Sequence, residues 1–275
     1  MEQKKKKRLN KFLYFAVLGI LVLVFIISAV YIASYLIDSR VQSSEYDELA
    51  ELVQSIKEQQ SGSTDSTITT GGSSNATDGE DSPSTILPEY QPIYEMNNDL
   101  VGWITVPDTK IDYPVMQTPS NTDYYLNHNF NKEWSAWGCI YARETCDINT
   151  PSDNITLYGH HMADGSMFAQ LDKFKKYAFW KEHQTFTFDT LYEHHTYQII
   201  AVFKTSAIVG QGFSYHLFDY ADSEEAFNEF ISTVKSLQMY ETGLTAEYGD
   251  MLLTLSTCEY TLEEGRFVVV AKRIS

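Results

Sequence analysis

The stretch TLSTCEYTLEEGRFVVV, residues 254–270, has the form of a β-hairpin that carries reactive groups beside its turn. Two β-rich apolar runs, MLLTLST and FVVVAKRI, flank a short loop that contains glycine. If Cys258 pairs with Arg266 across this loop, the same antiparallel register pairs Ser256 with Val268. The sequence therefore predicts that a thiol and a guanidinium are neighbours.

A cation beside a cysteine has chemical consequences. It favours the thiolate over the thiol, and it can donate hydrogen bonds to an oxyanion that develops during a reaction. Arginine suits both roles because it stays protonated and presents a planar fork of donors. The alternative for Cys258 is a buried strand residue, since cysteine is among the most buried residue types.

Short β-type runs dominate the chain after residue 86 and indicate a mainly β domain with helices. The predicted strands span residues 101–106, 113–116, 138–142, 154–159, 185–188, 196–205, 251–257 and 267–274. Helices are predicted at 89–98, around 166–174 and at 223–238, the last behind Ser223 as N-cap. Eight strands at this loose spacing favour a mixed or antiparallel sheet closed into a barrel.

A nucleophilic cysteine needs a proton-transfer partner, which is usually histidine. Among the seven histidines, His160 is the best candidate because the predicted strand 154–159 ends at Gly159. Its side chain is therefore expected at the rim of the sheet, where catalytic groups collect. A surface or structural histidine is the alternative.

The histidine pairs at 160–161 and 194–195 suggest a metal site at first sight. Adjacent residues on a strand point to opposite faces, however, and the sequence has no H-E-x-x-H, no paired C-x-x-C and no Gly-rich phosphate loop. No metal and no other cofactor is expected.

The N-terminal region has the pattern of a membrane anchor. Residues 12–37 form 26 consecutive positions without a charge, and about 20 apolar residues cross a bilayer. The alternative is a cleaved signal peptide, whose apolar stretch is typically only about 7–15 residues. Residues 1–11 form a basic tail, which the positive-inside rule places in the cytoplasm, so the rest of the chain is expected outside the cell.

Two further segments precede the β domain. Apolar residues at 3- and 4-residue spacings predict a helical stalk over residues 38–60. Residues 61–87 are rich in Gly, Ser and Thr and predict a flexible linker. The catalytic domain is then expected at 88–275.

Charge and cysteine content limit the possible partners. The formal net charge is −17, and because the first 37 residues are basic, the remaining body is strongly acidic. Nucleic-acid binding is not expected, since such a surface would repel a phosphate backbone. Three cysteines, an odd number, leave at least one free or paired between chains; Cys139 and Cys146 could bridge, but the sequence does not show that their geometry permits it.

The ordered motifs together resemble a known family. T-L-S-T-C at 254–258, Arg266, Y-G-H-H-M at 158–162 followed by D-G-S-M-F at 164–168, and an N-terminal anchor are similar to the class B sortases. The resemblance runs from about residue 88 to residue 274 and includes a helix-bearing insertion at about 206–248.

The resemblance implies an α+β fold: an eight-stranded sortase-type β-barrel with an N-terminal helix and a helix in the insertion before the penultimate strand. It also implies a transpeptidase on the outer face of a Gram-positive membrane. Such an enzyme cleaves a C-terminal sorting signal of a secreted protein after Thr, through a thioacyl intermediate, and transfers the protein to an amine of the cell-wall precursor.

The resemblance also implies roles for six residues. Cys258 would be the nucleophile, His160 the general acid and base, and Arg266 the group that positions substrate and stabilises the oxyanion. The expected substrate-binding residues are Ser256, Tyr158 and Glu259.

Two other functions fit the sequence. A hydrolytic cysteine endopeptidase would use the same Cys258 and His160 but release an acid product. A non-enzymatic, membrane-anchored surface binding module would contain Cys258 only as a core residue.

Overall fold

The computed structural model describes residues 2–62 and 85–275, with side chains from residue 13 to 60 and from 85 onward. The chain divides into two compact units, Met1–Glu45 and Tyr46–Ser275. The predicted linker, 61–87, lies almost wholly outside the described residues, as do the side chains of the predicted basic tail, 1–11.

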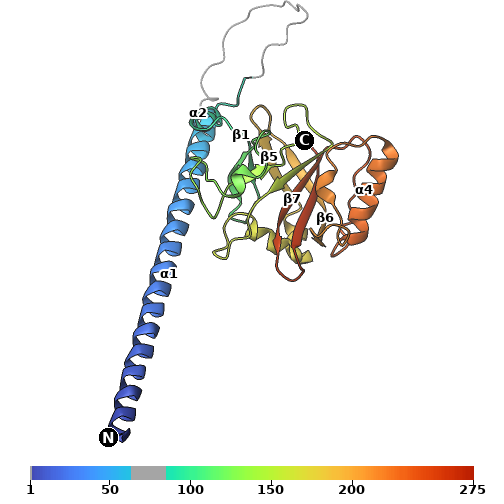
Figure 1. Ribbon diagram of the computed structural model, residues 1–275. Helices are drawn as coiled ribbons and strands as arrows, with labels where there is room; N and C mark the ends of the chain where they lie inside the picture. The colour runs from blue at the N-terminus through green and yellow to red at the C-terminus, as the bar shows by residue number, and fades with distance from the viewer. Residues whose placement is uncertain (1, 63–84) are drawn as a thin grey trace, which may run out of the picture. The chain divides into compact units, whose positions relative to one another are not determined.

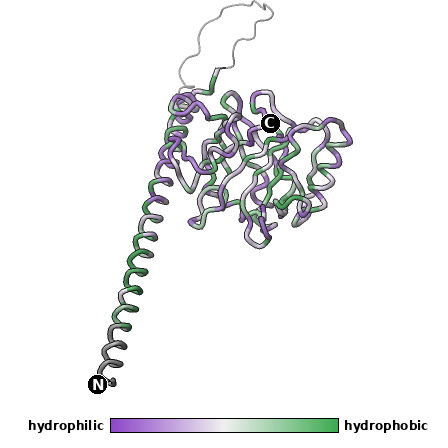
Figure 2. Tube along the Cα trace, viewed as in Figure 1, coloured by the Kyte–Doolittle hydropathy of each residue, from purple (hydrophilic) through white to green (hydrophobic). Residues whose placement is uncertain are grey.

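The first helix, α1 (Glu2–Gly62), contains the predicted membrane span. Its most apolar window within Leu13–Gln60 has a mean hydropathy of 2.9, and none of that window is buried. Figure 2 shows the apolar colour along this part of the helix. The helix is therefore long and apolar enough to cross a membrane, and a signal sequence near an N-terminus would have the same properties.

The C-terminal part of α1 belongs to the second unit. Tyr46, Leu49 and Val53 are buried, and the Tyr46 hydroxyl donates a 2.6 Å hydrogen bond to the carbonyl of Gly138. The stripe of apolar residues that predicts a helical stalk thus packs within this unit. The sequence places the start of the catalytic domain at residue 88, whereas the compact unit begins at Tyr46.

Eight strands close into a barrel in the order β1-β2-β3-β4-β7-β8-β6-β5, which confirms the predicted fold (Figure 1). Their bounds are β1 (Leu100–Thr105), β2 (Asp112–Met116), β3 (Ile140–Ala142), β4 (Asn154–Tyr158), β5 (Thr185–Thr190), β6 (Thr196–Ser206), β7 (Leu252–Glu259) and β8 (Gly265–Arg273). Each overlaps a strand predicted from β-forming residues.

Helices lie between the strands. They are α2 (Gln91–Met96), α3 (Tyr177–Glu182) and α4 (Glu224–Leu237), with 3-10 turns η2 (Tyr124–Leu126), η3 (Phe168–Lys175) and η4 (Tyr215–Leu217). The predicted helix around 166–174 is the 3-10 turn η3, and the sequence did not predict α3.

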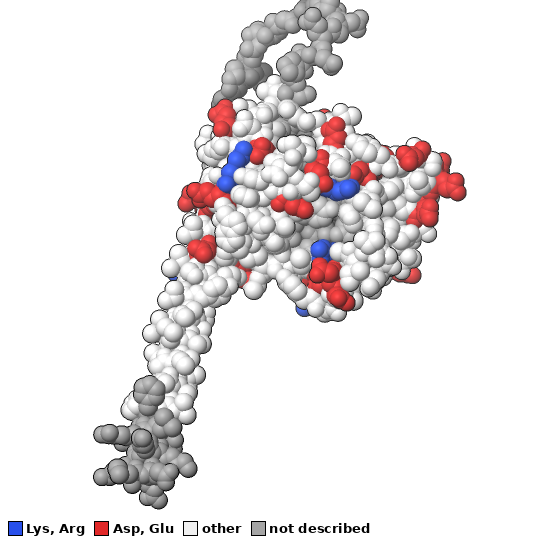
Figure 3. Space-filling view, in the orientation of Figure 1, with Lys and Arg blue, Asp and Glu red and all other residues white. Residues whose placement is uncertain are grey.

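Helix α4 lies in the insertion between β6 and β7, as predicted. Its N-cap is Ser223, whose side chain accepts a 3.2 Å hydrogen bond from the backbone N–H of Ala226. Its apolar face packs against β6, and the cluster includes Phe227, Phe230 and Val234. Acidic side chains gather over this helix on the face seen in Figure 3.

The hairpin quoted first forms with the predicted register. In the pairing of β7 with β8, Cys258 lies opposite Arg266 and Ser256 lies opposite Val268. The hairpin pairs with β4 on one side and with β6 on the other, so β7 and β8 lie in the middle of a four-stranded part of the barrel wall.

Candidate active site

Strand pairing brings His160 and Cys258 to the same edge of the barrel. Strands β4 and β7 are parallel neighbours, with Tyr158 opposite Ser256. His160 lies two residues after Tyr158, just past the end of β4, and Cys258 lies two residues after Ser256, near the end of β7. Residues far apart in the sequence are therefore brought to the carboxyl ends of two adjacent strands.

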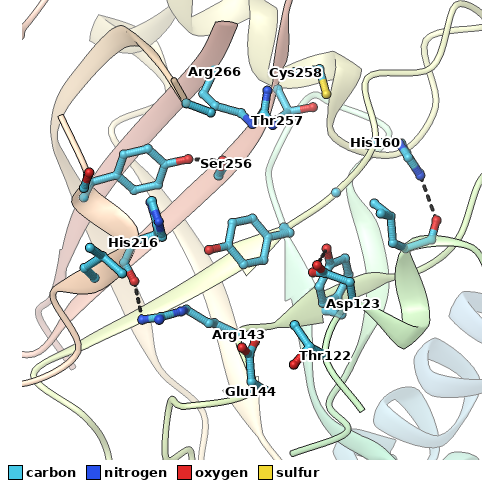
Figure 4. A pocket seen from close by; sticks show the side chains of 18 of the residues that line it. Thr122, Asp123, Arg143, Glu144, His160, His216, Ser256, Thr257, Cys258 and Arg266 are labelled. Atoms are coloured by element: carbon cyan, nitrogen blue, oxygen red, sulfur yellow. Dashed lines mark hydrogen bonds between the residues drawn. The ribbon is translucent and has the colours of Figure 1, made fainter. Parts of the chain in front are cut away.

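A pocket of about 580 Å³ opens at this edge (Figure 4). Cys258, His160, Arg266, Ser256 and Tyr158 all line it. The other lining residues are Thr122, Asp123, Leu126, Tyr141, Arg143, Glu144, Gly159, Ser206, Ala207, Phe213, Ser214, Tyr215, His216, Leu217 and Thr257. All three predicted catalytic residues thus line one cavity, together with two of the three predicted substrate-binding residues.

No disulfide joins the three cysteines, which all lie in the described part of the chain, and they differ in exposure. Cys139 and Cys146 are buried, whereas Cys258 is partly exposed. Burial raises the pKa of Cys146 to about 12, so this thiol is protonated at neutral pH. Cys258 is the cysteine that a substrate can reach.

The imidazole of His160 is held by a backbone carbonyl. Its Nε2 lies 2.8 Å from the carbonyl oxygen of Leu126, drawn as a dashed line in Figure 4. A carbonyl only accepts, so Nε2 carries the proton of this bond. The other ring nitrogen, Nδ1, is therefore the one that can exchange a proton with a substrate.

Gly159 allows the close packing that places His160. A Cβ at this position would lie 2.5 Å from Ile140 Cδ1 and 2.7 Å from Phe168 Cγ. Any side chain would push the chain away from the barrel wall. The backbone N–H of Phe168 also donates to the carbonyl of His160 at 3.0 Å, which fixes the segment that follows.

The guanidinium of Arg266 is oriented by its own turn. Its Nη1 donates to the carbonyls of Gly265 at 2.9 Å and Glu264 at 3.3 Å. Figure 4 shows the side chain next to Cys258 at one end of the pocket. This places a permanently charged cation beside the thiol.

Ser256 and Tyr158 line the pocket floor in different ways. The Ser256 hydroxyl is buried and lies 2.5 Å from the hydroxyl of Tyr215. Burial raises the pKa of Tyr158, so its phenol is a neutral group at physiological pH. Both residues are among those that line the pocket.

Glu259 is a correction to the sequence analysis. It is not among the residues that line this pocket in the described part of the chain, and its side chain is only 1% exposed. Adjacent residues on a strand face opposite ways, so Glu259 points away from the side that Cys258 occupies. There its carboxylate accepts hydrogen bonds from Lys204 Nζ at 2.7 Å and from the Thr261 hydroxyl at 2.7 Å.

This carboxylate is a structural anion. Burial alone would raise the pKa of Glu259, but hydrogen bonds from Lys204 and Thr261 outweigh that effect and lower the pKa to about 2. A carboxyl group whose pKa is depressed on folding stabilises the protein above its unfolded pKa. That contribution is lost as the pH falls through the folded value.

We therefore expect Glu259→Gln to lower the free energy of unfolding by about 2 kcal/mol at neutral pH, because Lys204 loses its charged partner. The difference from wild type should shrink as the pH falls from about 4.5 toward 2, where the native carboxylate is itself protonated. Thermal unfolding of both proteins across this pH range measures it. A difference that is constant with pH would contradict the assignment.

Several pocket residues escaped the sequence analysis. Arg143 follows β3, and Tyr215 and His216 come from the insertion. Burial and the nearby Arg143 lower the pKa of His216, so it is neutral at physiological pH. Neither the segment after β3 nor the insertion contains a local sequence motif that indicates a place in the pocket lining.

Among the described residues, no group of three or more His, Cys, Asp or Glu side chains is arranged to hold a metal ion.

Comparison with known proteins gives the family. The family model described as the Sortase domain matches residues 104–274. This chain belongs to the sortase family. Sortase B of Listeria monocytogenes is 33% identical over 192 residues, which are 69% of this chain and 76% of that protein. Sortase B of Staphylococcus aureus is 31% identical over 191 residues, again 69% of this chain and 76% of that protein.

The fold of this sortase agrees with solved structures. A Staphylococcus aureus sortase B-substrate complex superposes with a TM-score of 0.72 at 25% identity, covering 87% of this chain and 99% of that one. The class B resemblance read from the sequence motifs is thus confirmed, and membership of the family implies cysteine transpeptidase activity.

Proposed function

We propose that this sortase cleaves a C-terminal sorting signal after Thr and transfers the protein, through a thioacyl intermediate on Cys258, to an amine of the cell-wall precursor. The observation that carries the proposal is that Cys258, His160 and Arg266 line one pocket of about 580 Å³. Acyl transfer needs these three elements: a nucleophile, a proton carrier and an oxyanion donor.

The geometry supports a sequence of proton and acyl transfers. The Cys258 thiol passes its proton to His160 Nδ1 as its sulfur attacks the carbonyl carbon of the Thr residue, and Arg266 faces the oxyanion that forms. The C–N bond then breaks, and the departing amine takes a proton from His160 Nδ1, while Nε2 stays bonded to Leu126. In the second half, the acceptor amine attacks the thioester, gives its proton to Nδ1 and releases the sulfur.

We further propose that residues 12–37 anchor the enzyme in the cell membrane, with the N-terminus in the cytoplasm and the catalytic domain outside. The length and apolar character of α1 support an anchor, and the basic residues before it support this orientation. An anchored enzyme meets a membrane-tethered substrate at a raised effective concentration.

Mass spectrometry tests the proposal. The full chain is incubated with a panel of Thr-containing pentapeptides. Cys258 is then searched for an acyl adduct whose mass corresponds to the peptide up to and including its Thr. Adding an amine should convert the adduct into a peptide–amine product. Absence of an adduct across a broad panel would count against the reaction.

The same experiment separates the two alternative functions. A cysteine endopeptidase would release free acid at a rate that added amine does not change. A non-enzymatic binding module would give no adduct. The partial exposure of Cys258 in a pocket with His160 favours an enzyme over the binding module.

For Arg266→Lys we expect a fall in the rate of acyl-enzyme formation of about 10²-fold, with little change in the unfolding temperature. Lysine keeps the charge but loses the planar fork, which in wild type bonds two turn carbonyls while facing the pocket. Single-turnover kinetics with a reactive peptide measures the effect. Arg273→Lys, at the far end of β8, is the matched control, and an unchanged rate for Arg266→Lys would remove its oxyanion role.

A further inference from the structure

One wall of the pocket is a segment of the insertion between β6 and β7. Residues 213–217 line the cavity, and Tyr215 within them reaches Ser256 on β7 through the 2.5 Å contact between their hydroxyls. Because this wall comes from a loop rather than from a barrel strand, its place depends on what holds the loop.

Arg143, from the other side of the pocket, holds this wall. Its Nη1 donates to both carboxylate oxygens of Asp219, at 3.0 and 2.8 Å, and to the backbone carbonyl of His216. The two side chains are only 16% and 12% exposed. Solvent therefore screens this ion pair much less than a surface pair, and loss of one partner leaves a largely buried charge.

Further donors fix Asp219 from the same side. The Thr145 hydroxyl donates to its Oδ2 at 2.5 Å, and the Cys146 thiol lies 3.6 Å from its Oδ1. The backbone N–H of Asn154 donates to the Asp219 carbonyl at 3.1 Å. The carboxylate of Asp219, two residues after the wall segment in the same insertion, is thus held against the barrel by Arg143 and Thr145.

A separate apolar contact attaches the same segment to α4. The ring of Phe218 stacks on Phe230, with centroids 4.0 Å apart and an interplanar angle of 9°. Loss of the polar contacts would therefore leave the segment packed on α4 and let its pocket side shift. Folding of the segment should therefore depend mainly on the stacking of Phe218 on Phe230, and the position of the pocket wall on the polar contacts of Arg143.

We propose that Arg143, acting through Asp219 and the His216 carbonyl, is a positioning residue that sets the pocket wall at Tyr215 for the peptide substrate. The inference rests on the proposed function in taking a peptide as the occupant of the pocket. Figure 4 shows Arg143 and Cys258 at opposite ends of the cavity. Arg143 should therefore govern peptide binding and leave the reactivity of the thiol unchanged.

The test uses the full chain in detergent and three measurements. These are kcat and KM for the most reactive pentapeptide, the rate at which N-ethylmaleimide alkylates Cys258 without peptide, and the unfolding temperature. Arg143→Gln removes the cation, Arg143→Lys keeps the charge, and Asp219→Asn weakens the same pair from its other side. Arg273→Gln is the matched control outside the pocket lining.

For Arg143→Gln we expect KM to rise about 10-fold or more, with kcat within about 3-fold and the alkylation rate within about 2-fold of wild type. Arg143→Lys should restore part of the KM loss, and Asp219→Asn should raise KM as Arg143→Gln does. If Arg143→Gln does not fold, the other two variants decide.

Two results would overturn the inference: an unchanged KM in the folded variants, or a fall of kcat and alkylation rate that matches the change in KM. If wild type forms no adduct with any peptide, the proposed reaction fails separately. The peptide concentration that halves alkylation of Cys258 then replaces KM, and an equal value in wild type and Arg143→Gln would overturn the inference.

Discussion

Cys258→Ala is expected to abolish the acyl adduct and to lower turnover of a sorting peptide by about 10⁴-fold or more. In the proposed mechanism the Cys258 sulfur bonds the acyl group, and no other cysteine can replace it, since Cys139 and Cys146 are buried. Mass spectrometry and steady-state kinetics of the variant measure both effects. The unfolding temperature should change little, because Cys258 is only partly buried.

Cys139→Ala is the control for this experiment. It removes a buried thiol that does not line the pocket, so the variant should keep the adduct on Cys258. Full turnover by Cys258→Ala would indicate another nucleophile and would remove the assigned mechanism.

His160→Ala is expected to lower kcat by about 10³-fold, since the leaving amine and the acceptor amine both exchange protons with this ring in the proposed mechanism. The ring is held through Nε2 by Leu126, so its loss leaves a cavity beside the pocket. Added imidazole should enter that space and restore part of the rate. Structural damage alone would not respond to imidazole.

His183→Ala provides the matched histidine control. His183 follows the C-terminal end of α3, with Nε2 2.8 Å from Asp108 Oδ2, and is not part of the pocket lining. Its removal should leave turnover within about 2-fold of wild type and insensitive to imidazole. Comparable losses in the two variants would mean that His160 acts on stability and not on proton transfer.

The local parts of the fold could be predicted from the sequence because local physics decides them. β-forming runs locate the strands, and the short loop after Cys258 fixes its register with Arg266. Ser223 and the apolar spacing behind it indicate α4 in the same way.

The non-local parts of the site required the structure. His160 and Cys258 line one pocket because β4 and β7 pair in parallel, and no local pattern specifies that pairing. The bond between Arg143 and Asp219 likewise joins segments from different parts of the chain. From the sequence, His160 is linked to Cys258 only by its expected place at the rim of the sheet and by the family resemblance.

Glu259 shows a different kind of error. The resemblance suggested a place in the groove from its position beside Cys258, although strand alternation already argued for the opposite face. Its buried contacts with Lys204 and Thr261 follow from that alternation.

For the membrane-anchored enzyme proposed above, the packing of the end of α1 within the barrel unit affects how the enzyme could be shed from a cell. Tyr46, Leu49 and Val53 are buried there, and Lys57 Nζ donates to the Tyr90 hydroxyl at 3.1 Å. A protease that nicks the backbone between residues 62 and 85 would leave both fragments held together by these contacts. Release of soluble enzyme would instead need a cut on the N-terminal side of Tyr46.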